Sequence, residues 1–401
     1  MIEYGDAVRE VIANARPLPG EAVPLSGALG RTLSRDIRAA GNIPPFVKAT
    51  MDGYAVRAAD TAPAGDAGGV ELRVTEDLPA GRVSRRPLGP GQAARIMTGA
   101  PLAKGADAVV MVEDTEMAGD GVKIRRAVRP GDNIGPAGED VARGDLVLEK
   151  GDLIGPAEVG MLAALGQATV WVARRPKVAV VATGDEIVEP GEKACPGQIR
   201  NANGPALTAA VLQAGASASY LGIARDCSAS LGRRIEKAAP ADILVLSGGV
   251  SVGDYDLVRD ELRASGVRPV FWQVRIKPGK PLFFGVRRRQ LVFGLPGNPT
   301  SAMVTFHLFV RPALDRMLGR KAIGPRAGKA ILGQAMTLRP GRTQFLRALR
   351  VGDGPELRVV PYPDQQSGVL RSMVRSRVLI VAGAELSRLE EGQAVDVLFI
   401  D

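Results

Sequence analysis

Val178-Ala-Val-Val-Ala-Thr-Gly-Asp-Glu186 begins the stretch that decides the fold, which covers residues 174–320. A short apolar run ends here in a polar turn, and the same change recurs at Ser247-Gly-Gly-Val-Ser-Val-Gly-Asp254 after residues 243–246. Two further turns follow, Lys277-Pro-Gly-Lys-Pro281 and Gly294-Leu-Pro-Gly-Asn-Pro299. Ligands of open α/β sheets bind in the crevice outside the carboxyl ends of the strands. The pattern therefore predicts one ligand site formed by these turns.

Strand-like and helix-like segments alternate throughout residues 176–320, which predicts a doubly wound, mostly parallel α/β domain with helices on both faces. The predicted strands cover residues 177–182, 217–223, 242–246, 269–274 and 291–294. The predicted helices cover residues 203–215, 228–239, 256–265 and 299–318. The single histidine, His307, lies among Phe306, Leu308 and Phe309, so we interpret it as a packed helix residue rather than a general base.

The segments around this domain are rich in β signals. Residues 47–140 contain short alternating runs separated by Gly, Pro and Asp, which predicts an inserted small β domain, either a barrel or a sandwich. Residues 1–46 and 141–175 flank the insert and are predicted to form one elongated linker domain, whose helix over 4–15 can pack on the α/β domain. Residues 321–401 are predicted to form a C-terminal β domain. The expected fold class is thus α/β plus β in an elongated multidomain chain.

The charge balance favours a small anionic substrate over nucleic acid. The 401 residues carry 52 Lys and Arg against 43 Asp and Glu, a net charge of +9. These charges are scattered, apart from residues 287–289, which we interpret as a solvated hairpin tip. Only 4% of residues are aromatic, so stacking platforms for single-stranded nucleic acid are not expected.

The remaining composition indicates a cytoplasmic protein without a membrane span. No apolar run approaches 18 residues, and the N-terminus lacks the basic and apolar regions of a signal peptide. Cys195 and Cys227 have no partners at metal-ligand spacing and are interpreted as free thiols.

The turns at the predicted strand ends suit a phosphate and a divalent cation. Gly248 and Gly249 let backbone N–H groups approach a phosphate closely. Asp254 and Asp256 follow, and carboxylates beside bound phosphate are typical of Mg²⁺ sites, although helix capping explains either residue equally well.

The two later turns can also bind an anion, but each has a simpler explanation. Lys277 and Lys280 place two ammonium groups on one rigid turn, which alone could be an exposed basic turn. Pro296 and Pro299 lead into a helix whose N-terminus can receive an anion, or they simply start that helix.

The order and spacing of these motifs resemble the molybdopterin molybdenumtransferase family, which includes MoeA and the gephyrin E domain. The resemblance covers essentially the whole chain. It is carried by Pro44-Pro-Phe46, Met51-Asp-Gly-Tyr-Ala55, Ile96-Met-Thr-Gly-Ala-Pro101, Gly105-Ala-Asp107, Gly138-Glu-Asp140 and the turns quoted above.

The resemblance implies that adenylated molybdopterin and molybdate are the substrates, and that Mg²⁺-dependent release of AMP accompanies molybdenum insertion. It also implies a homodimer whose active site lies between the α/β domain of one protomer and the β insert of the other. The family's acids correspond to catalytic Asp52, Asp140 and Glu186, with Thr98 close by, and to metal-binding Asp226 and Asp256.

The substrate-binding positions implied by the resemblance lie in the α/β and C-terminal domains. We expect molybdate between these domains, where Arg347 would supply a planar fork of donors and Ser367 a hydroxyl. The full expected set is Ser247, Gly248, Gly249, Ser251, Lys277, Lys280, Pro296, Pro299, Arg347 and Ser367.

One position departs from the family pattern, and two alternative functions are retained. Phe271-Trp272 is followed by Gln273, where the family often has a lysine, so an essential lysine at that position is in doubt. A molybdopterin adenylyltransferase shares the α/β unit, but the additional β domains argue against it, and that enzyme is instead a possible partner. A gephyrin-like scaffold is the other alternative, although no receptor-anchoring linker is recognisable.

Overall fold

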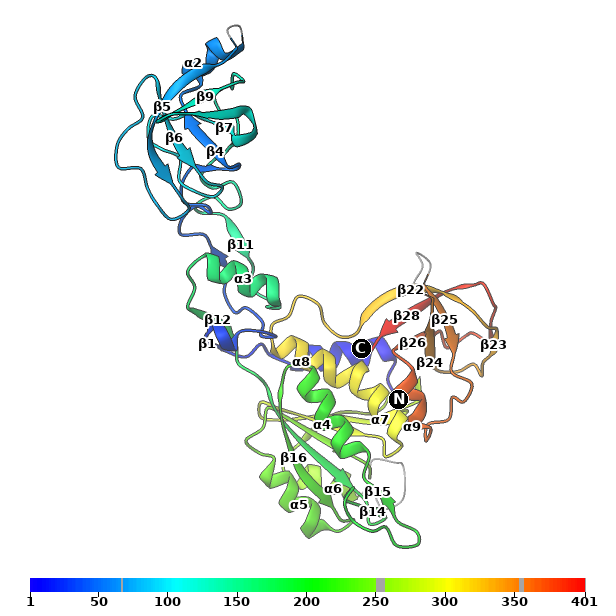
Figure 1. Ribbon diagram of the computed structural model, residues 1–401. Helices are drawn as coiled ribbons and strands as arrows, with labels where there is room; N and C mark the ends of the chain where they lie inside the picture. The colour runs from blue at the N-terminus through cyan, green and yellow to red at the C-terminus, as the bar shows by residue number, and fades with distance from the viewer. Residues whose placement is uncertain (66–67, 250–256, 353–356, 401) are drawn as a thin grey trace.

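The computed structural model describes residues 1–65, 68–249, 257–352 and 357–400 and shows an elongated, angular molecule (Figure 1). The β insert forms one end, a small linker domain lies in the middle, and the α/β domain with the C-terminal β domain forms the other end. The predicted fold class is confirmed, because a central α/β sheet is combined with separate β domains.

The α/β domain is built on a six-stranded sheet with the strand order β16-β13-β17-β21-β20-β18. The first four strands are parallel, and the last two run antiparallel to their neighbours. The strands are β13 (Lys177–Thr183), β16 (Ser217–Ala224), β17 (Ile243–Ser247), β18 (Arg268–Gln273), β20 (Pro281–Arg287) and β21 (Gln290–Leu295). A short parallel pair, β14 (Ile187–Val188) with β15 (Ile199–Arg200), lies beside the sheet.

Helices cover both faces of this sheet, because successive residues of a buried strand point to opposite sides. Val178 and Val180 of β13 belong to one hydrophobic cluster, and Ala179 and Val181 belong to the other. The first face carries α1 (Tyr4–Asn14), α4 (Asn203–Gln213), α7 (Pro299–Thr305) and α8 (Arg311–Met317). The second face carries α5 (Ser228–Lys237) and α6 (Leu257–Ala264).

The segment predicted as one long helix over 299–318 contains a π-helical turn, Phe306–Val310, between α7 and α8. His307 lies in this turn, is only 7% exposed, and makes an edge contact with the Phe306 ring. Burial lowers the pKa of His307 to about 4, so the imidazole is neutral at pH 7. These features agree with the interpretation of His307 as a packing residue.

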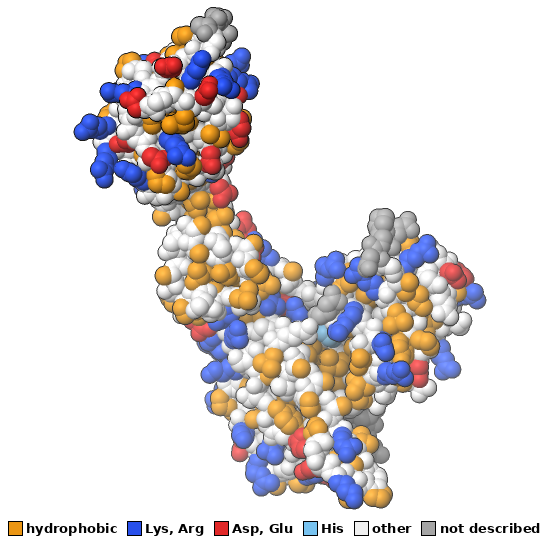
Figure 2. All heavy atoms as spheres, in the orientation of Figure 1, with side chains coloured by type: hydrophobic (Ala, Val, Ile, Leu, Met, Phe, Trp, Pro, Cys, Tyr) orange, Lys and Arg blue, Asp and Glu red, His pale blue; other side chains and the backbone are white. Residues whose placement is uncertain are grey.

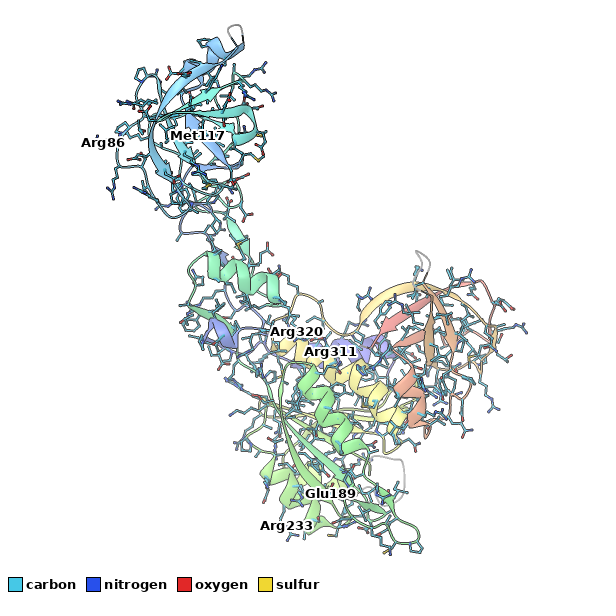
Figure 3. The ribbon with its side chains drawn as sticks, viewed as in Figure 1. Arg86, Met117, Glu189, Arg233, Arg311 and Arg320 are labelled. Carbon is cyan, nitrogen blue, oxygen red and sulfur yellow. The ribbon has the colours of Figure 1, made fainter. Side chains whose placement is uncertain are left out.

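A buried carboxylate near the end of α8 binds the residues that follow this helix. Asp315 is 1% exposed and accepts hydrogen bonds from Arg311 Nε at 2.9 Å, Arg320 Nη1 at 2.7 Å and the Gly324 N–H at 3.0 Å. Figure 3 shows both arginines at the junction where the α/β domain meets the linker domain. This arrangement fixes the chain that leaves α8 for the C-terminal domain.

The C-terminal domain is a closed β-barrel. Its strands pair in the circular order β24-β25-β22-β28-β26 and back to β24, which leaves no free edge among these strands. They are β22 (Arg326–Leu332), β24 (Thr343–Val351), β25 (Arg358–Pro361), β26 (Val378–Ala382) and β28 (Ala394–Phe399). The short pair β23 (Met336–Thr337) and β27 (Arg388–Leu389) and helix α9 (Leu370–Arg375) complete the domain.

Strand β19 (Ile276–Lys277) comes from the α/β domain and pairs with β24, so it joins the two domains.

The linker domain is formed by two segments that lie on either side of the insert in the sequence. Strand β1 (Gly20–Pro24) pairs with β12 (Thr169–Ala173), and β2 (Ile37–Arg38) pairs with β11 (Leu146–Leu148). Helix α3 (Pro156–Ala164) packs on these pairs through Leu162. The domain has its own small hydrophobic cluster, centred on Leu33 and Val172.

The insert is one six-stranded sheet with the order β7-β4-β6-β5-β9-β8. These strands are β4 (Gly53–Val56), β5 (Val70–Leu78), β6 (Gln92–Ile96), β7 (Ala108–Met111), β8 (Thr115–Ala118) and β9 (Gly121–Ile124). The two faces have separate cores, because Tyr54 and Val56 point to one cluster and Ala55 to the other. The two edge strands, β7 and β8, are not paired with each other in the described residues. The sheet is therefore open and is not the closed barrel considered from the sequence. Helix α2 (Ala58–Thr61) and the pair β3 (Lys48–Ala49) with β10 (Ile134–Gly135) complete the insert.

Within the described ranges, every helix is either too short or too polar to cross a lipid bilayer.

Phe345 of β24 is predicted to be essential for the contact between α1 and the barrel. Its side chain is fully buried, and its ring centroid lies 4.9 Å from that of Tyr4 in α1. We expect Phe345→Ala to lower the free energy of unfolding by about 3–5 kcal/mol, as measured by urea denaturation, because a large cavity would form. Val374→Ala on α9, where the side chain is 67% exposed, is the control and should change stability by less than about 0.5 kcal/mol. Equal stability of the two variants would contradict this role.

Candidate active site

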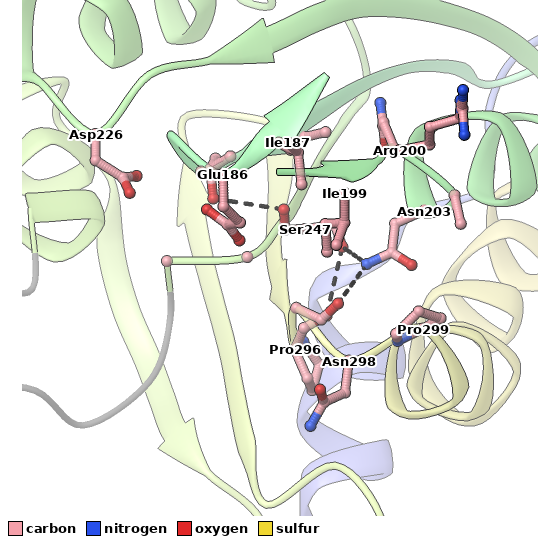
Figure 4. A pocket seen from close by; sticks show the side chains of 18 of the residues that line it. Glu186, Ile187, Ile199, Arg200, Asn203, Asp226, Ser247, Pro296, Asn298 and Pro299 are labelled. Atoms are coloured by element: carbon pink, nitrogen blue, oxygen red, sulfur yellow. Dashed lines mark hydrogen bonds between the residues drawn. The ribbon is translucent and has the colours of Figure 1, made fainter. Parts of the chain in front are cut away.

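The loops after three parallel strands meet at one edge of the α/β sheet. Ala182 of β13 lies opposite Ser247 of β17, and Ser247 lies opposite Leu295 of β21. The turns that follow therefore start at the same level and line a pocket of about 430 Å³ (Figure 4). The predicted positions Glu186, Asp226, Ser247, Gly248, Gly249, Pro296 and Pro299 all line this pocket.

Two of these turns approach each other so closely that only glycine fits. Gly248 has a φ of +103°, and a Cβ placed there would lie 2.5 Å from the Thr183 carbonyl oxygen. A Cβ on Gly297 would lie 3.6 Å from the Gly248 Cα. The Gly248 N–H donates to the Leu295 carbonyl at 3.1 Å. The wall of the pocket is therefore backbone at this point, as a phosphate-binding loop requires.

Asn203, the first residue of α4, connects the loops, and the sequence analysis missed it. Its Nδ2 donates to Ser247 Oγ at 2.9 Å and to the Gly297 carbonyl at 2.7 Å (Figure 4). The only sequence signal was an asparagine at the start of a helix, which is also a common capping position. Here its side chain fixes the Ser247 hydroxyl at the pocket wall.

Carboxylates gather where β13 and β16 end. The Asp226 backbone N–H donates to Asp185 Oδ1 at 3.1 Å, and Glu186 follows in the same loop. Partial burial, and then the negative charges of Asp185 and Glu186, raise the pKa of Asp226. The Arg225 guanidinium does not pair with these carboxylates, since its Nη1 donates to the Asp185 and Ile187 carbonyls at 3.0 Å each. The charge of Arg225 therefore only partly offsets the negative charge of the carboxylates, and the pKa of Asp226 stays raised.

A second pocket, of about 650 Å³, adjoins the first and shares Pro281, Pro296 and Asn298 with it. Lys277 and Lys280, both half-buried, line one wall of this pocket from the α/β domain. The opposite wall comes from the C-terminal domain and includes Arg342, Gln365, Gln366 and Ser367. Because β19 pairs with β24, the lysine turn is held directly against the barrel.

Ser367 is tied to the start of α7. Its Oγ accepts a hydrogen bond from Asn298 Nδ2 at 2.9 Å, and its carbonyl accepts one from the Thr300 N–H at 3.2 Å. The Thr300 N–H therefore already has a protein acceptor, whereas Ser301, the next residue of α7, lines the second pocket. That this helix directs its N-terminus at an anion stays a prediction.

The placement of Arg347 also needs correction. Its side chain is fully buried and does not line the pocket; Nε donates to Ser372 Oγ at 2.8 Å, and Nη2 donates to the Asp364 carbonyl at 2.8 Å and the Gln366 carbonyl at 3.1 Å. Arg347 thus supports the loop that carries Ser367, and its buried Nη1 has no acceptor in the described residues. Burial lowers the pKa of Arg347 to about 10, so it stays charged at pH 7. The arginine on the pocket wall is Arg342, which no sequence motif had indicated.

The remaining predicted acids lie in or beside the insert. Asp52 Oδ1 accepts hydrogen bonds from the Thr98 hydroxyl and the Thr98 N–H, both at 2.7 Å, and these bonds lower the pKa of Asp52. Asp140 lies where the insert joins the linker domain, and its N–H donates to the Ile43 carbonyl at 3.0 Å. Within one chain the insert is remote from the α/β pocket (Figure 1), so these residues are not brought together with Glu186.

Three predicted positions, Ser251, Asp254 and Asp256, lie outside the described residues. Gln273, the position that departs from the family pattern, ends β18, and its carbonyl accepts a hydrogen bond from the Ile2 N–H at 3.0 Å. Gln273 does not line either of the two pockets.

Together, the fold and the pockets define a multidomain α/β protein with a basic pocket between its α/β domain and a β-barrel. Three family models cover nearly the whole chain: the MoeA N-terminal region (domain I and II) over residues 2–166, a probable molybdopterin binding domain over 179–316, and the MoeA C-terminal region (domain IV) over 329–400. The chain belongs to the MoeA family.

Individual relatives agree with this assignment. The chain is 38% identical over 401 residues to molybdopterin molybdenumtransferase 2 of Mycobacterium tuberculosis, with 98% of each chain covered. It is 35% identical over 404 residues to molybdopterin molybdenumtransferase of Bacillus subtilis, covering all of this chain and 94% of that one. A crystal structure of a molybdopterin biosynthesis MoeA protein from Pyrococcus horikoshii superposes with a TM-score of 0.88 at 36% identity, covering 100% of this chain and 99% of that chain.

Gly248 is predicted to tolerate no side chain. Gly248→Ala would force a Cβ against the Thr183 carbonyl oxygen, and we expect this clash to lower the free energy of unfolding by about 1–3 kcal/mol. The positive φ at Gly248 strains any residue with a Cβ, which would lower stability further. Gly144→Ala is a matched control, because Gly144 has a similar φ of +98° but no heavy atom within 4 Å of its Cβ position. Urea denaturation of both variants separates the clash from the effect of the positive φ, because only Gly248→Ala has the clash. An equal loss of unfolding free energy in the two variants would contradict close packing at Gly248.

Proposed function

We propose that this protein transfers molybdenum from molybdate to adenylated molybdopterin and releases AMP. The observation that carries the proposal is the adjacency of two different pockets in a chain of this family. One pocket combines glycine backbone with carboxylates, and the other combines two lysines with an arginine. Their shared residues, Pro281, Pro296 and Asn298, allow two anionic substrates to meet.

The chain's residues have separate tasks in this reaction. The Gly249 N–H and the Ser247 hydroxyl, which Asn203 holds, would bind the substrate's phosphates. The Gly248 N–H already donates to the Leu295 carbonyl, so Gly248 would contribute by letting the phosphates approach the backbone closely. Lys277, Lys280 and Arg342 would bind molybdate, because a tetrahedral dianion needs positive donors that converge from different directions. Arg347 would act indirectly, by holding the Gln365–Ser367 loop at the far wall. Water would attack the phosphoanhydride, and AMP would leave with the bridging oxygen.

A magnesium ion is part of the proposal. Among the described residues, no group of three or more potential ligands is positioned to hold a metal ion. Mg²⁺, however, usually takes only one or two carboxylates and completes its coordination with water and phosphate oxygens. The crowded carboxylates at Asp226 and Asp185, with the raised pKa of Asp226, fit such a cation. Asp226, together with Asp256, would hold it, and the bound ion would neutralise phosphate charge.

We also propose a homodimer, in which the insert of one protomer completes the site of the other with Asp52, Thr98 and Asp140. Support comes from large apolar side chains that stay exposed on and beside the linker domain (Figure 2). Leu29 is 59% exposed and Leu153 is 54% exposed, which is costly for a domain with so small a core. The others are Phe46, Val47, Met51, Leu146 and Trp171.

The alternative functions are less well supported. The relatives named above are transferases matched over nearly their full length, which favours the transferase over a molybdopterin adenylyltransferase or a gephyrin-like scaffold. A cytoplasmic location and delivery of substrate by a molybdopterin adenylyltransferase are further parts of the proposal, and neither nucleic acid nor a membrane is expected as a partner.

The molybdate site is tested by titrating molybdate against AMP release. Lys280→Ala and Arg342→Ala each remove one charged donor, so each should weaken apparent molybdate affinity by roughly 1.5–3 kcal/mol, about tenfold or more. The control is Lys329→Ala on the barrel, where the lysine is paired with Asp396 and lies outside the pocket. An unchanged molybdate dependence in both pocket variants would refute the assignment.

The magnesium site is tested through Asp226. Asp226→Asn removes a carboxylate from a crowded cluster, so stability should be unchanged or higher, whereas the Mg²⁺ concentration needed for AMP release should rise by at least about tenfold. Glu10→Gln, which removes an exposed carboxylate from α1, should change neither quantity. A normal Mg²⁺ dependence in Asp226→Asn would exclude this residue as a ligand.

The composite site is tested by mixing two impaired variants at a molybdate concentration that limits the reaction. Asp52→Asn affects the insert and Lys280→Ala affects the α/β domain, so a mixed dimer contains one site that has neither substitution. We expect the mixture to release AMP faster than either variant alone after subunits have exchanged. If both residues act within one protomer, mixing will restore nothing.

A further inference from the structure

A third cavity, of about 620 Å³, lies at the opposite end of the α/β sheet from the two pockets of the candidate active site. It is lined by Asp242, just before β17, by Leu291 near the start of β21, and by Arg174, just before β13. The candidate active site lies beyond the other ends of the same strands. Because β13 has seven residues, the two sites are about 20 Å apart.

Five arginines surround this cavity: Arg16, Arg174, Arg268, Arg288 and Arg289. Its single carboxylate, Asp242, is fully used, because it accepts Arg174 Nη1 at 3.0 Å and Nη2 at 2.8 Å and the Lys177 N–H at 2.7 Å. The guanidinium groups of the other four arginines are exposed and have no hydrogen-bond or ion-pair partner within the described part of the chain. The cavity therefore holds a large excess of positive charge.

The hairpin that carries two of these arginines has an unusual backbone. Arg287 pairs with Gln290, so Arg288 and Arg289 form the two-residue turn between β20 and β21. Arg288 has a φ of +55°. Glycine or asparagine is preferred at such a position, and a long side chain there strains the backbone. A strained residue in a charged cavity indicates that the side chain has a role other than forming the turn.

Both segments that connect the linker domain to the α/β domain also line the cavity. The first runs from Arg16 to Pro19, between α1 and β1, and the second contains Arg174, between β12 and β13. They are tied together where the Arg174 N–H donates to the Pro19 carbonyl at 3.0 Å. A ligand in this cavity would therefore contact the linker domain's two connections and the α/β hairpin at once.

We propose that this cavity binds a small phosphate-bearing anion, which holds the linker domain in a fixed orientation on the α/β domain. Guanidinium groups suit phosphate oxygens because they present several donors in a planar fork. The cavity volume is that of a small-molecule site, and its floor, with Leu18, Leu291 and Met317, is apolar. Among the described residues no aromatic side chain lines it, so the phosphates rather than a stacked base would provide recognition.

The test is calorimetric titration of the full-length protein with inorganic pyrophosphate at constant ionic strength. Arg288→Gly combined with Arg289→Ser should weaken binding tenfold or more, while AMP release stays normal and the melting temperature is equal or higher, because glycine suits the turn. Arg233→Ser combined with Arg358→Ser removes the same charge elsewhere, at α5 (Figure 3) and β25, and should leave binding unchanged.

Two further measurements identify the site and its effect. Lys277→Ala combined with Lys280→Ala should retain pyrophosphate binding, since it alters only the pockets at the other end of the sheet. In the wild type, pyrophosphate should slow amide hydrogen exchange at residues 16–20 and 174–177, and this effect should be absent from the Arg288→Gly/Arg289→Ser variant. Displacement of pyrophosphate by AMP would indicate a nucleotide ligand, and retention would indicate a simpler phosphate.

The proposal is overturned if the arginine variant binds pyrophosphate as well as the wild type does. It is equally overturned if binding is lost only in the lysine variant, or if exchange at the two connecting segments does not respond.

Discussion

The site depends on the register of three parallel strands. Ala182, Ser247 and Leu295 lie side by side, so the turns that follow β13, β17 and β21 begin at a common level. The loop after Ser247 can then pack on the Thr183 carbonyl and on Gly297 without any intervening side chain. A shift of one residue in any of these strands would reverse its two faces and separate the loops. The backbone pairing of these strands thus places the loops that line the pocket.

Much of this arrangement was predictable because it is local in the sequence. Strands β13, β17 and β21 are each a short apolar run that ends in a turn containing glycine or proline, and such runs can be identified without knowing their partners. The insert was recognisable for the same reason, from its alternating runs. The grouping of Glu186, Ser247 and Pro296 around one pocket followed from the rule for strand ends, whereas Asp226 was expected there only from the family resemblance.

The features that could not be predicted depend on contacts between distant segments. Arg342 reaches the pocket only because β24 pairs with β19, which lies about 70 residues earlier in the chain. Arg347 has the same charge and lies within β24, whereas Arg342 lies just before that strand, but Arg347 is buried beneath the loop that it supports. The sequence shows that both residues are arginines, but it does not show which side chains face the neighbouring domain. Closure of the C-terminal sheet into a barrel similarly depends on the pairing of β24 with β26.

The placement of α1 has a consequence for synthesis of the chain. Ala7 and Val11 are fully buried in the same hydrophobic cluster as Leu314 of α8, about 300 residues later. At about 5–20 residues per second, a ribosome needs roughly 15–60 s to add that much chain. During this interval the linker domain and the insert can fold, but the apolar face of α1 has no native partner. Helix α1 therefore leaves the ribosome long before its native partner α8, and it is a natural binding segment for a chaperone.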